Sequence, residues 1–437
     1  MAAPTPSSST AISASHANTA KSAMYLLTSL FFTWGFITVI NNTLLPHLRS
    51  VFELNYTQTT LIESVWFIAY FFASIPSARL IERVGYKKSL VTGLVIMAVG
   101  ALMMIPAAHL PSYGVTLFAL FVIACGITLL QVAANPYVAV VGPASSASAR
   151  LNLVQAFNSL GTMLAPLFGG YLILGRSNSG TASADQVLTQ AERLADARAV
   201  ELPYLIVAGV LVILAIVIAR FPLPEIGAST NREAAKAARK NHSLWKHRNL
   251  VFGIPAIFIY LIAEIGVANL FINFVSQPDI GNVNHEKASH YLIILWGGMM
   301  VGRFAGSILM RKFTAESVLA GCSIGAAIVM TVATFSGGSL AMWALISVGL
   351  FHSVMFPTIF TLGIKGLGPM TEEGSGLMIM AIAGGALVVL QGMLADHYGL
   401  QMSFLLTVAC EIYVLFYALW GSKATNAFPE EPASDVK

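Results

Sequence analysis

The segment GITLLQVAANPYVAVVGP, from Gly126 to Pro143, combines a long apolar run with two side-chain amides and a proline. The two amides, Gln131 and Asn135, are four residues apart, so they lie on the same face of a helix. An unpaired amide is costly in hydrocarbon, and this face is therefore expected to contact protein, water or a ligand rather than lipid. The segment predicts a membrane helix with one polar face.

A second segment, GLFHSVMFPTIFTLGI from Gly349 to Ile364, resembles a degenerate copy of the first. Aligning Pro357 with Pro136 places His352 at the position of Gln131. Polar side chains at equivalent depths of two related helices indicate a pseudo-twofold molecule with one site between its halves.

The composition excludes an ordinary soluble protein. Hydrophobic residues make up 56% of the chain and charged residues 10%, whereas about a quarter of the residues of a soluble domain are charged. A net charge of +4 over 437 residues is no nucleic-acid signature, because the basic residues fall in short loops between apolar segments. Cys125, Cys322 and Cys410 lie in apolar segments without a pairing pattern, so we expect core residues rather than disulfides or metal ligands.

Twelve apolar segments are long enough to be membrane helices, each of which needs about 20 residues. Their expected spans are 23–45, 58–78, 89–108, 113–139, 151–174, 203–221, 250–274, 289–310, 317–335, 340–363, 376–395 and 400–420. The sequence therefore predicts an all-α polytopic membrane protein.

The one long charged linker divides these helices six plus six. The expected units are a disordered cytoplasmic tail at 1–22, an N-terminal six-helix bundle at 23–221, a cytoplasmic linker at 222–248, a C-terminal six-helix bundle at 249–421 and a cytoplasmic tail at 422–437. Lysine and arginine predict the orientation: if both termini are cytoplasmic, the outer loops contain only Arg49, Arg176, Arg193, Arg198 and Lys287. The positive-inside rule thus places both termini in the cytoplasm.

The loop between the second and third helices, ARLIERVGYKKSL at 78–90, resembles the loop signature of the major facilitator superfamily. Glu82 replaces the usual Asp, Arg83 and Gly85 match, and Ala78 stands where Gly is usual. A solvated basic loop would account for the charge but not for this spacing. A degenerate second copy, GRFAGSILMRKF at 302–313, follows the eighth helix. The side chains that we expect to take part in gating rather than in substrate binding are Glu82, Arg83, Arg303 and Arg311.

Four further segments narrow the resemblance to the fucose permease family and, within it, to bacterial glucose/galactose transporters. These segments are NNTLLPHL at 41–48, LLQVAANPYV at 129–138, RLNLVQAFNSLG at 150–161 and FPTIFTLGIKGLG at 356–368. The resemblance implies a proton-linked or cation-linked monosaccharide importer of the bacterial inner membrane that works by alternating access.

One departure from that family concerns its acids. The family ties an aspartate of the first helix and a glutamate of the fourth to proton coupling and sugar binding, and the matching residues here are Asn42 and Gln131. Neither amide titrates, so the resemblance implies a role in sugar binding at these positions but not in protonation.

A monosaccharide site needs hydrogen-bonding side chains and aromatic rings around a small cavity. In the fifth helix, Asn152, Gln155 and Asn158 are spaced by three along one face. Each amide could instead form a structural helix-to-helix hydrogen bond, which averages only ~0.6 kcal/mol in membrane bundles. The predicted substrate-binding residues are Trp34, Asn41, Asn42, Gln131, Asn135, Gln155, Asn158, Glu264, Asn269 and His352.

Glu264 lies near the middle of the seventh span, in YLIAEIGVANLF. A charged carboxylate there costs at least ~2.5–3.5 kcal/mol, so it should be protonated, paired or in contact with water. We expect Glu264 to couple transport to a cation, to bind a sugar hydroxyl, or both, and His352 to be a second coupling residue. A structural hydrogen bond is the alternative for each. Glu63, near a helix end, and Glu411, in the twelfth helix, are weaker candidates.

The predicted function is import of a hexose, such as glucose or galactose, by alternating access with proton symport. The alternatives are sugar uniport, sodium-coupled symport, or transport of fucose or an amino sugar. We expect no enzymatic activity, no cofactor and no metal, because the sequence contains no cluster of catalytic or metal-ligating residues. The expected partners are the sugar, a coupling cation (H⁺ or Na⁺) and the lipid bilayer, with no nucleic acid, and one chain suffices for a pathway.

Overall fold

The computed structural model describes residues 22–38, 56–109, 112–169, 201–223, 237–238 and 242–428. These residues form helices and connecting turns, with no strand among them. Ten of the described helices are long and apolar enough to cross a membrane. The helix Ser22–Thr38 and α5 (Ala147–Gly169) correspond to the first and fifth predicted spans. The prediction of an all-α polytopic membrane protein is confirmed.

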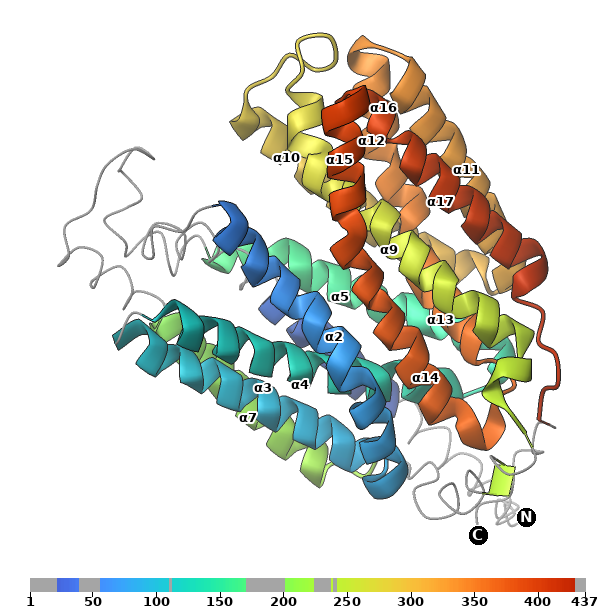
Figure 1. Ribbon diagram of the computed structural model, residues 1–437. Coiled ribbons are helices and arrows are strands. Elements are labelled where there is room, and N and C mark those ends of the chain that lie inside the picture. Colours follow the sequence, from blue (N-terminus) through green and yellow to red (C-terminus); the bar gives the residue numbers. More distant parts are fainter. Residues whose placement is uncertain are drawn as a thin grey trace, which may run out of the picture.

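The first half of the chain forms one bundle (Figure 1). Besides Ser22–Thr38 and α5, it contains α2 (Tyr56–Val84), α3 (Tyr86–His109), α4 (Tyr113–Val140) and α7 (Glu201–Arg220). Helix α3 packs against α4 and α7, and α4 packs against α2. Gly85 joins α2 to α3 with φ 83°, a conformation that glycine adopts without steric cost, which explains the glycine of the predicted loop signature.

The second half forms the other bundle. Its elements are α9 (Arg248–Val275), α10 (His285–Leu309), α11 (Ala315–Phe335), α12 (Gly338–His352), α13 (Met355–Ile364), α14 (Thr371–Met380), η6 (Ala381–Val388), α15 (Val389–Tyr398), α16 (Leu400–Ser403), α17 (Leu405–Phe416) and η7 (Tyr417–Gly421). Helix α17 packs against α9 and α11, and η6 packs against α9.

The tenth predicted span is present as Gly338–Ile364, but it is interrupted and consists of two helices rather than the single helix expected from sequence. Helix α12 ends at His352 and α13 begins at Met355. The physical reason is Pro357, which has no N–H to donate to the carbonyl of Ser353 four residues earlier. Its counterpart Pro136 lies inside a continuous α4. The two related helices therefore accommodate their prolines differently.

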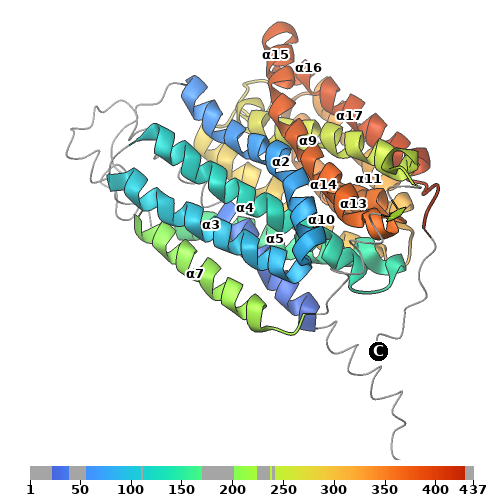
Figure 2. The same ribbon diagram turned by 60° about the horizontal axis from the view of Figure 1, so that its bottom comes forward.

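The two bundles meet mainly through α2, α4 and α5 of the first half and α10, α13 and α14 of the second. In Figure 1 they approach one another at the lower right, where α13 and α14 lie close to the first bundle. The same elements remain adjacent in the turned view of Figure 2. We call this end of the molecule the linker side, because α7 ends and α9 begins there.

The eleventh span touches α9 closely at Gly384, and a glycine-to-alanine pair tests this contact. A Cβ at Gly384 would lie 2.2 Å from the carbonyl oxygen of Phe258, whereas a Cβ at Gly392 would meet nothing within 4 Å. The Phe258 main chain cannot move aside as easily as a flexible side chain would. Gly384→Ala should therefore destabilise the protein by about 1–3 kcal/mol. Thermal unfolding in detergent should show a midpoint temperature below that of the wild type for Gly384→Ala and an unchanged midpoint temperature for Gly392→Ala. Equal midpoints would contradict this packing.

Candidate functional site

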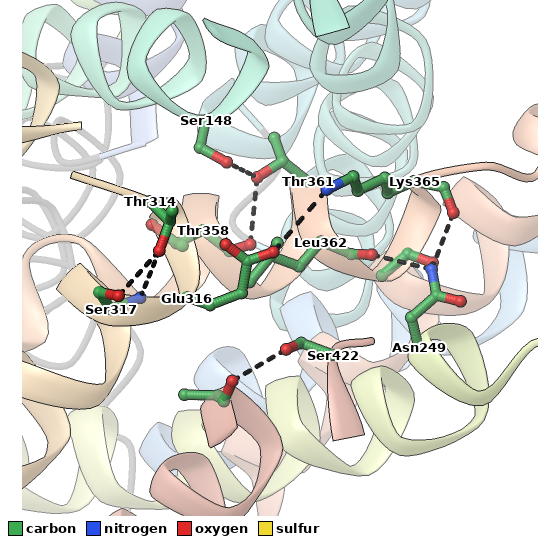
Figure 3. Close-up of polar contacts among 12 residues, drawn as sticks. Ser148, Asn249, Thr314, Glu316, Ser317, Thr358, Thr361, Leu362, Lys365 and Ser422 are labelled. Carbon is green, nitrogen blue, oxygen red and sulfur yellow. Dashed lines mark hydrogen bonds and ion pairs between the residues drawn. The ribbon is translucent and has the colours of Figure 1, made fainter. Parts of the chain in front are cut away.

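Hydroxyl and amide groups join the two halves on the linker side. The hydroxyls of Ser148 in α5 and Thr361 in α13 lie 2.6 Å apart (Figure 3). The amide of Asn152 donates to the hydroxyl of Thr358 at 3.2 Å, one turn further into the membrane along α5. Ser148, Thr358 and Thr361 are buried, so water does not compete for these bonds. In the described conformation the halves are closed against each other at this end.

The carbonyl that Pro136 frees in α4 takes part in this closure. Pro136 has no N–H, so the carbonyl of Val132 lacks its usual donor within the helix. The hydroxyl of Ser375 in α14 donates to this carbonyl at 3.1 Å, and both residues are completely buried. A donor from the second half thus satisfies an acceptor in the first.

The corresponding carbonyl in the second half is bound by an arginine. Nε of Arg303 in α10 donates to the carbonyl of Ser353 at 3.1 Å, and the hydroxyl of Tyr260 in α9 donates to the neighbouring carbonyl of His352 at 2.9 Å. Both acceptors lie at the break between α12 and α13. These two donors replace the hydrogen bonds that the helix loses there.

The same arginine also reaches the first half. Its guanidinium donates to the carbonyl of Gln155 at 3.3 Å and to the hydroxyl of Ser159, both in α5. Phe304, next to Arg303, packs edge-on against Phe157 with ring centroids 5.6 Å apart. Arg303 therefore links α5 to the helix break, and its gating role, predicted from sequence, stays a proposal.

Glu264 lies beside this arrangement on α9. Its carboxylate is within hydrogen-bonding reach of the Tyr260 hydroxyl and within Coulomb range of Arg303 and His352. Its side chain is partly exposed, whereas Tyr260 is fully buried. Because a phenol has one O–H proton, Tyr260 can donate either to Glu264 or to the His352 carbonyl, but not to both.

His352 contacts a carboxylate of the second half. Nε2 of its ring lies 2.8 Å from Oε1 of Glu411 in α17, with the two side chains 3% and 0% exposed. Oε2 of Glu411 is buried without a hydrogen-bond partner in the described part of the chain. From sequence, Glu411 is a weaker candidate than Glu264, because the twelfth helix of the resembling fold usually lies outside the central cavity. The contact with His352 could not be read from local spacing, since it joins two distant helices.

The amides predicted in the first half have varied surroundings. Gln131 donates to the hydroxyl of Tyr70 in α2, and Asn158 donates to the carbonyl of Phe31 at 2.9 Å. Asn135 is 0% exposed, and neither of its amide atoms has a hydrogen-bond partner within the described residues. Of the three, Asn135 is therefore the amide whose whole hydrogen-bonding capacity remains for a ligand or water.

The other predicted residues lie as follows. Trp34 is buried against Phe31, with ring centroids 5.1 Å apart, and Asn269 is exposed on α9. Glu82 is buried, while Arg83 and Arg311 are exposed. Asn41, Asn42 and the side chain of Glu63 lie outside the described residues, so their roles stay predictions.

Several residues of this arrangement carry no sequence signal. Ser375, Ser148 and Thr361 are hydroxyl residues in ordinary helical contexts, and Tyr70 is one aromatic among many. The prolines do indicate that the carbonyls of Val132 and Ser353 need outside donors. They do not indicate which residue supplies the donor, because that depends on how the halves pack.

Comparisons with known proteins agree with this architecture. A family model described as the Major Facilitator Superfamily matches residues 26–390. The glucose/galactose transporter of Brucella abortus is 44% identical over 403 residues, covering 92% of this chain and 94% of that protein. A putative glucose/galactose transporter of Helicobacter pylori is 40% identical over 407 residues, covering 92% and 97%. The crystal structure of the Escherichia coli fucose:proton symporter matches with a TM-score of 0.82 and 31% identity over 92% of this chain and 98% of that one.

The hydrogen bond from Ser375 to the Val132 carbonyl should hold the linker side closed. Ser375→Ala leaves that buried carbonyl without its donor, which costs about 1–3 kcal/mol in the closed conformation only. The equilibrium should then shift about fivefold or more toward the conformation open on this side. Maleimide labelling of Thr358→Cys, with the three native cysteines replaced by alanine, should become faster by that factor.

A matched control is Ser323→Ala. The Ser323 hydroxyl is also buried, but it donates to the Leu319 carbonyl at 3.0 Å within its own helix. The control should leave the labelling rate of Thr358→Cys unchanged. Equal rates in the Ser375→Ala and Ser323→Ala backgrounds would contradict a closing role for Ser375.

Proposed function

The chain belongs to the major facilitator superfamily, and from this we propose that it imports a monosaccharide, a hexose such as glucose or galactose, by alternating access. Two curated relatives are named as glucose/galactose transporters, and the matched crystal structure is of a fucose:proton symporter. Since these relatives are transporters, they support the expectation of a transporter rather than an enzyme. The proposed sugar site lies between the halves near the membrane midplane.

The observation that carries this proposal is the group formed by Glu264, Arg303 and Tyr260. A carboxylate accepts hydrogen bonds from sugar hydroxyls, and a guanidinium donates to the oxygens of the same hydroxyls. Glu264 is partly exposed, and Arg303 already reaches across to α5. A sugar that binds Glu264 and Arg303 would therefore act directly on a contact between the halves.

The first half would supply amides to the same sugar. Asn135 has both amide atoms buried and without a partner in the described residues, a state that costs about 1–3 kcal/mol unless a ligand or water satisfies them. We assign Gln131 and Asn158 to the edge of this site, because each already donates one hydrogen bond to a neighbouring helix. Asn41, Asn42, Gln155, Asn269, His352 and Trp34 are retained as proposed substrate-binding residues.

Opening toward the linker side would need the inter-half contacts to separate. These are the Ser148–Thr361, Asn152–Thr358 and Ser375–Val132 hydrogen bonds and the Arg303 contacts. With Glu82, Arg83 and Arg311, they form the proposed gate. If both termini are cytoplasmic, as the positive-inside rule predicts, the described conformation is closed toward the cytoplasm. We propose an inner-membrane location and a monomer, since one chain holds the whole proposed pathway.

We propose proton symport as the coupling mode. The titratable side chains of the second half support it: Glu264 is partly exposed, and His352 and Glu411 are buried. Sodium symport is the alternative, because Asn and Gln oxygens can coordinate a hard cation. Uniport is the other alternative, since Asn42 and Gln131 do not titrate.

Sugar recognition by Glu264 is tested by substitution. Glu264→Gln replaces a charged acceptor with a neutral amide, and hydrogen bonds to charged groups contribute about 1.5–3 kcal/mol. The half-saturating glucose concentration in counterflow should therefore rise roughly 10- to 100-fold. Asp396→Asn, which changes an exposed carboxylate on α15, is the matched control and should leave it unchanged. An unchanged value for Glu264→Gln would remove Glu264 from the sugar site.

The coupling mode is tested by uptake of labelled glucose and galactose into proteoliposomes. With an imposed pH gradient, proton symport should accumulate one of these sugars above its outside concentration. Accumulation driven only by a sodium gradient would indicate sodium symport instead of proton symport. Equilibration of the sugar without an effect of either gradient would indicate uniport. Uptake of neither sugar above that of protein-free vesicles would contradict hexose transport.

A further inference from the structure

The buried pair His352–Glu411 has one hydrogen bond and one unused acceptor. The distance from Nε2 to Oε1 is 2.8 Å, and Oε2 of Glu411 has no donor in the described part of the protein. Neutral imidazole with ionised carboxylate gives this pair a net charge of −1 in a space that is 3% and 0% exposed. One additional proton makes the pair neutral, as imidazolium with carboxylate or as imidazole with carboxylic acid. Because an unbalanced buried charge is costly, binding or release of one proton changes the energetics of this space strongly.

The groups around this pair do not neutralise it in another way. Glu411 is within Coulomb range of Tyr260 on α9, of Cys322 on α11 and of its own neighbour Cys410 on α17. A phenol and thiols carry no positive charge that could balance the carboxylate. Arg303, the nearby cation, is instead engaged with the Ser353 carbonyl and α5, and its Coulomb partners include Glu264 and Tyr260.

The pair is mechanically connected to the proposed sugar site through the break between α12 and α13. His352 is the last residue of α12, directly before the break. The carbonyl of His352 accepts from Tyr260, whose hydroxyl is also within reach of Glu264. Glu264 and the His352 carbonyl compete for the one proton of Tyr260. A sugar hydroxyl that donates to Glu264 removes this competition, so Tyr260 keeps its bond to the His352 carbonyl. Sugar binding and protonation therefore act on the same short segment.

We propose that the His352–Glu411 pair binds the coupled proton, with Glu264 acting on the sugar side of the helix break; this inference rests on the proposed sugar symport. The pair is closed to water in the described conformation, so its proton can exchange only when the break rearranges. A site that opens to one side at a time is what coupling by alternating access requires. Each cycle then carries one proton from the outer solution onto the pair and releases it on the linker side.

The test compares wild-type protein with Glu411→Gln in proteoliposomes that contain a pH-sensitive dye. Glucose or galactose added outside should acidify the interior of wild-type vesicles, and a pH gradient should drive accumulation. In Glu411→Gln, sugar-dependent acidification and gradient-driven accumulation should be lost, at least tenfold below wild type, while labelled-sugar counterflow persists. Asp396→Asn, with an exposed carboxylate, should behave as wild type in all three assays.

The outcomes separate the two proposals. If wild type accumulates sugar with the pH gradient and Glu411→Gln does so equally, proton symport stands and the His352–Glu411 site is overturned. If wild type shows no sugar-dependent acidification, the proposed symport fails and this inference fails with it. Should Glu411→Gln not be recovered as monodisperse protein, His352→Gln replaces it in the acidification and accumulation assays. Both values are then divided by the counterflow rate of that variant, because His352 is also a proposed substrate-binding residue. Loss of coupling only in Glu264→Gln, with both pair variants coupled, would move the proton site to Glu264.

Discussion

Pro136 and Pro357, at equivalent positions of the two halves, each deprive a main-chain carbonyl of its donor, and much of the contact between the halves follows from how those carbonyls are satisfied. In hydrocarbon no water can replace the missing bond, so a side chain from another helix must. Ser375 donates to the Val132 carbonyl from the opposite half, and Arg303 donates to the Ser353 carbonyl while also reaching α5. The hydrogen bonds that satisfy the freed carbonyls and those that hold the two halves together are thus made by the same side chains.

The two halves resolve this constraint differently, and the difference places the titratable chemistry in the second half. In α4 a neutral hydroxyl suffices, and the helix remains continuous through Pro136. Between α12 and α13 the helix breaks, and two carbonyls are bound by the side chains of Arg303 and Tyr260. The break leaves His352 at a helix end, where it pairs with Glu411. By contrast, the side chains singled out in α4, Gln131 and Asn135, are amides, which bind hydroxyls but do not exchange protons.

The sequence allowed the helices and their pairing into halves to be predicted, because a bilayer permits few other arrangements for apolar segments of this length. It also marked Gln131, Asn135, Glu264 and Arg303 as unusual.

The sequence could not reveal the contacts of these residues. Ser375 is 243 positions from its acceptor and His352 is 59 from Glu411. Those contacts depend on helix rotation and on which half-to-half conformation is populated, neither of which is encoded by local spacing. The break after His352 is explained by Pro357, but it could not be predicted from that proline alone, because α4 stays continuous through Pro136.

Carbonyls freed by proline are suited to a contact that has to open and close. A carbonyl bonded within its helix cannot change partner without unwinding the helix, whereas those of Val132 and Ser353 can exchange a side-chain donor for another donor while the helix stays intact. When the halves separate on the linker side, water enters and can hydrate the exposed carbonyl and the released hydroxyl of Ser375. The net cost of opening each contact is then near that of an ordinary exchange of hydrogen bonds, about 0.5–1.5 kcal/mol, rather than the larger cost of leaving a buried group unpaired. A few such contacts are strong enough to favour one conformation and weak enough for sugar and proton binding to reverse it, because coupling between sites is itself only about 1–3 kcal/mol.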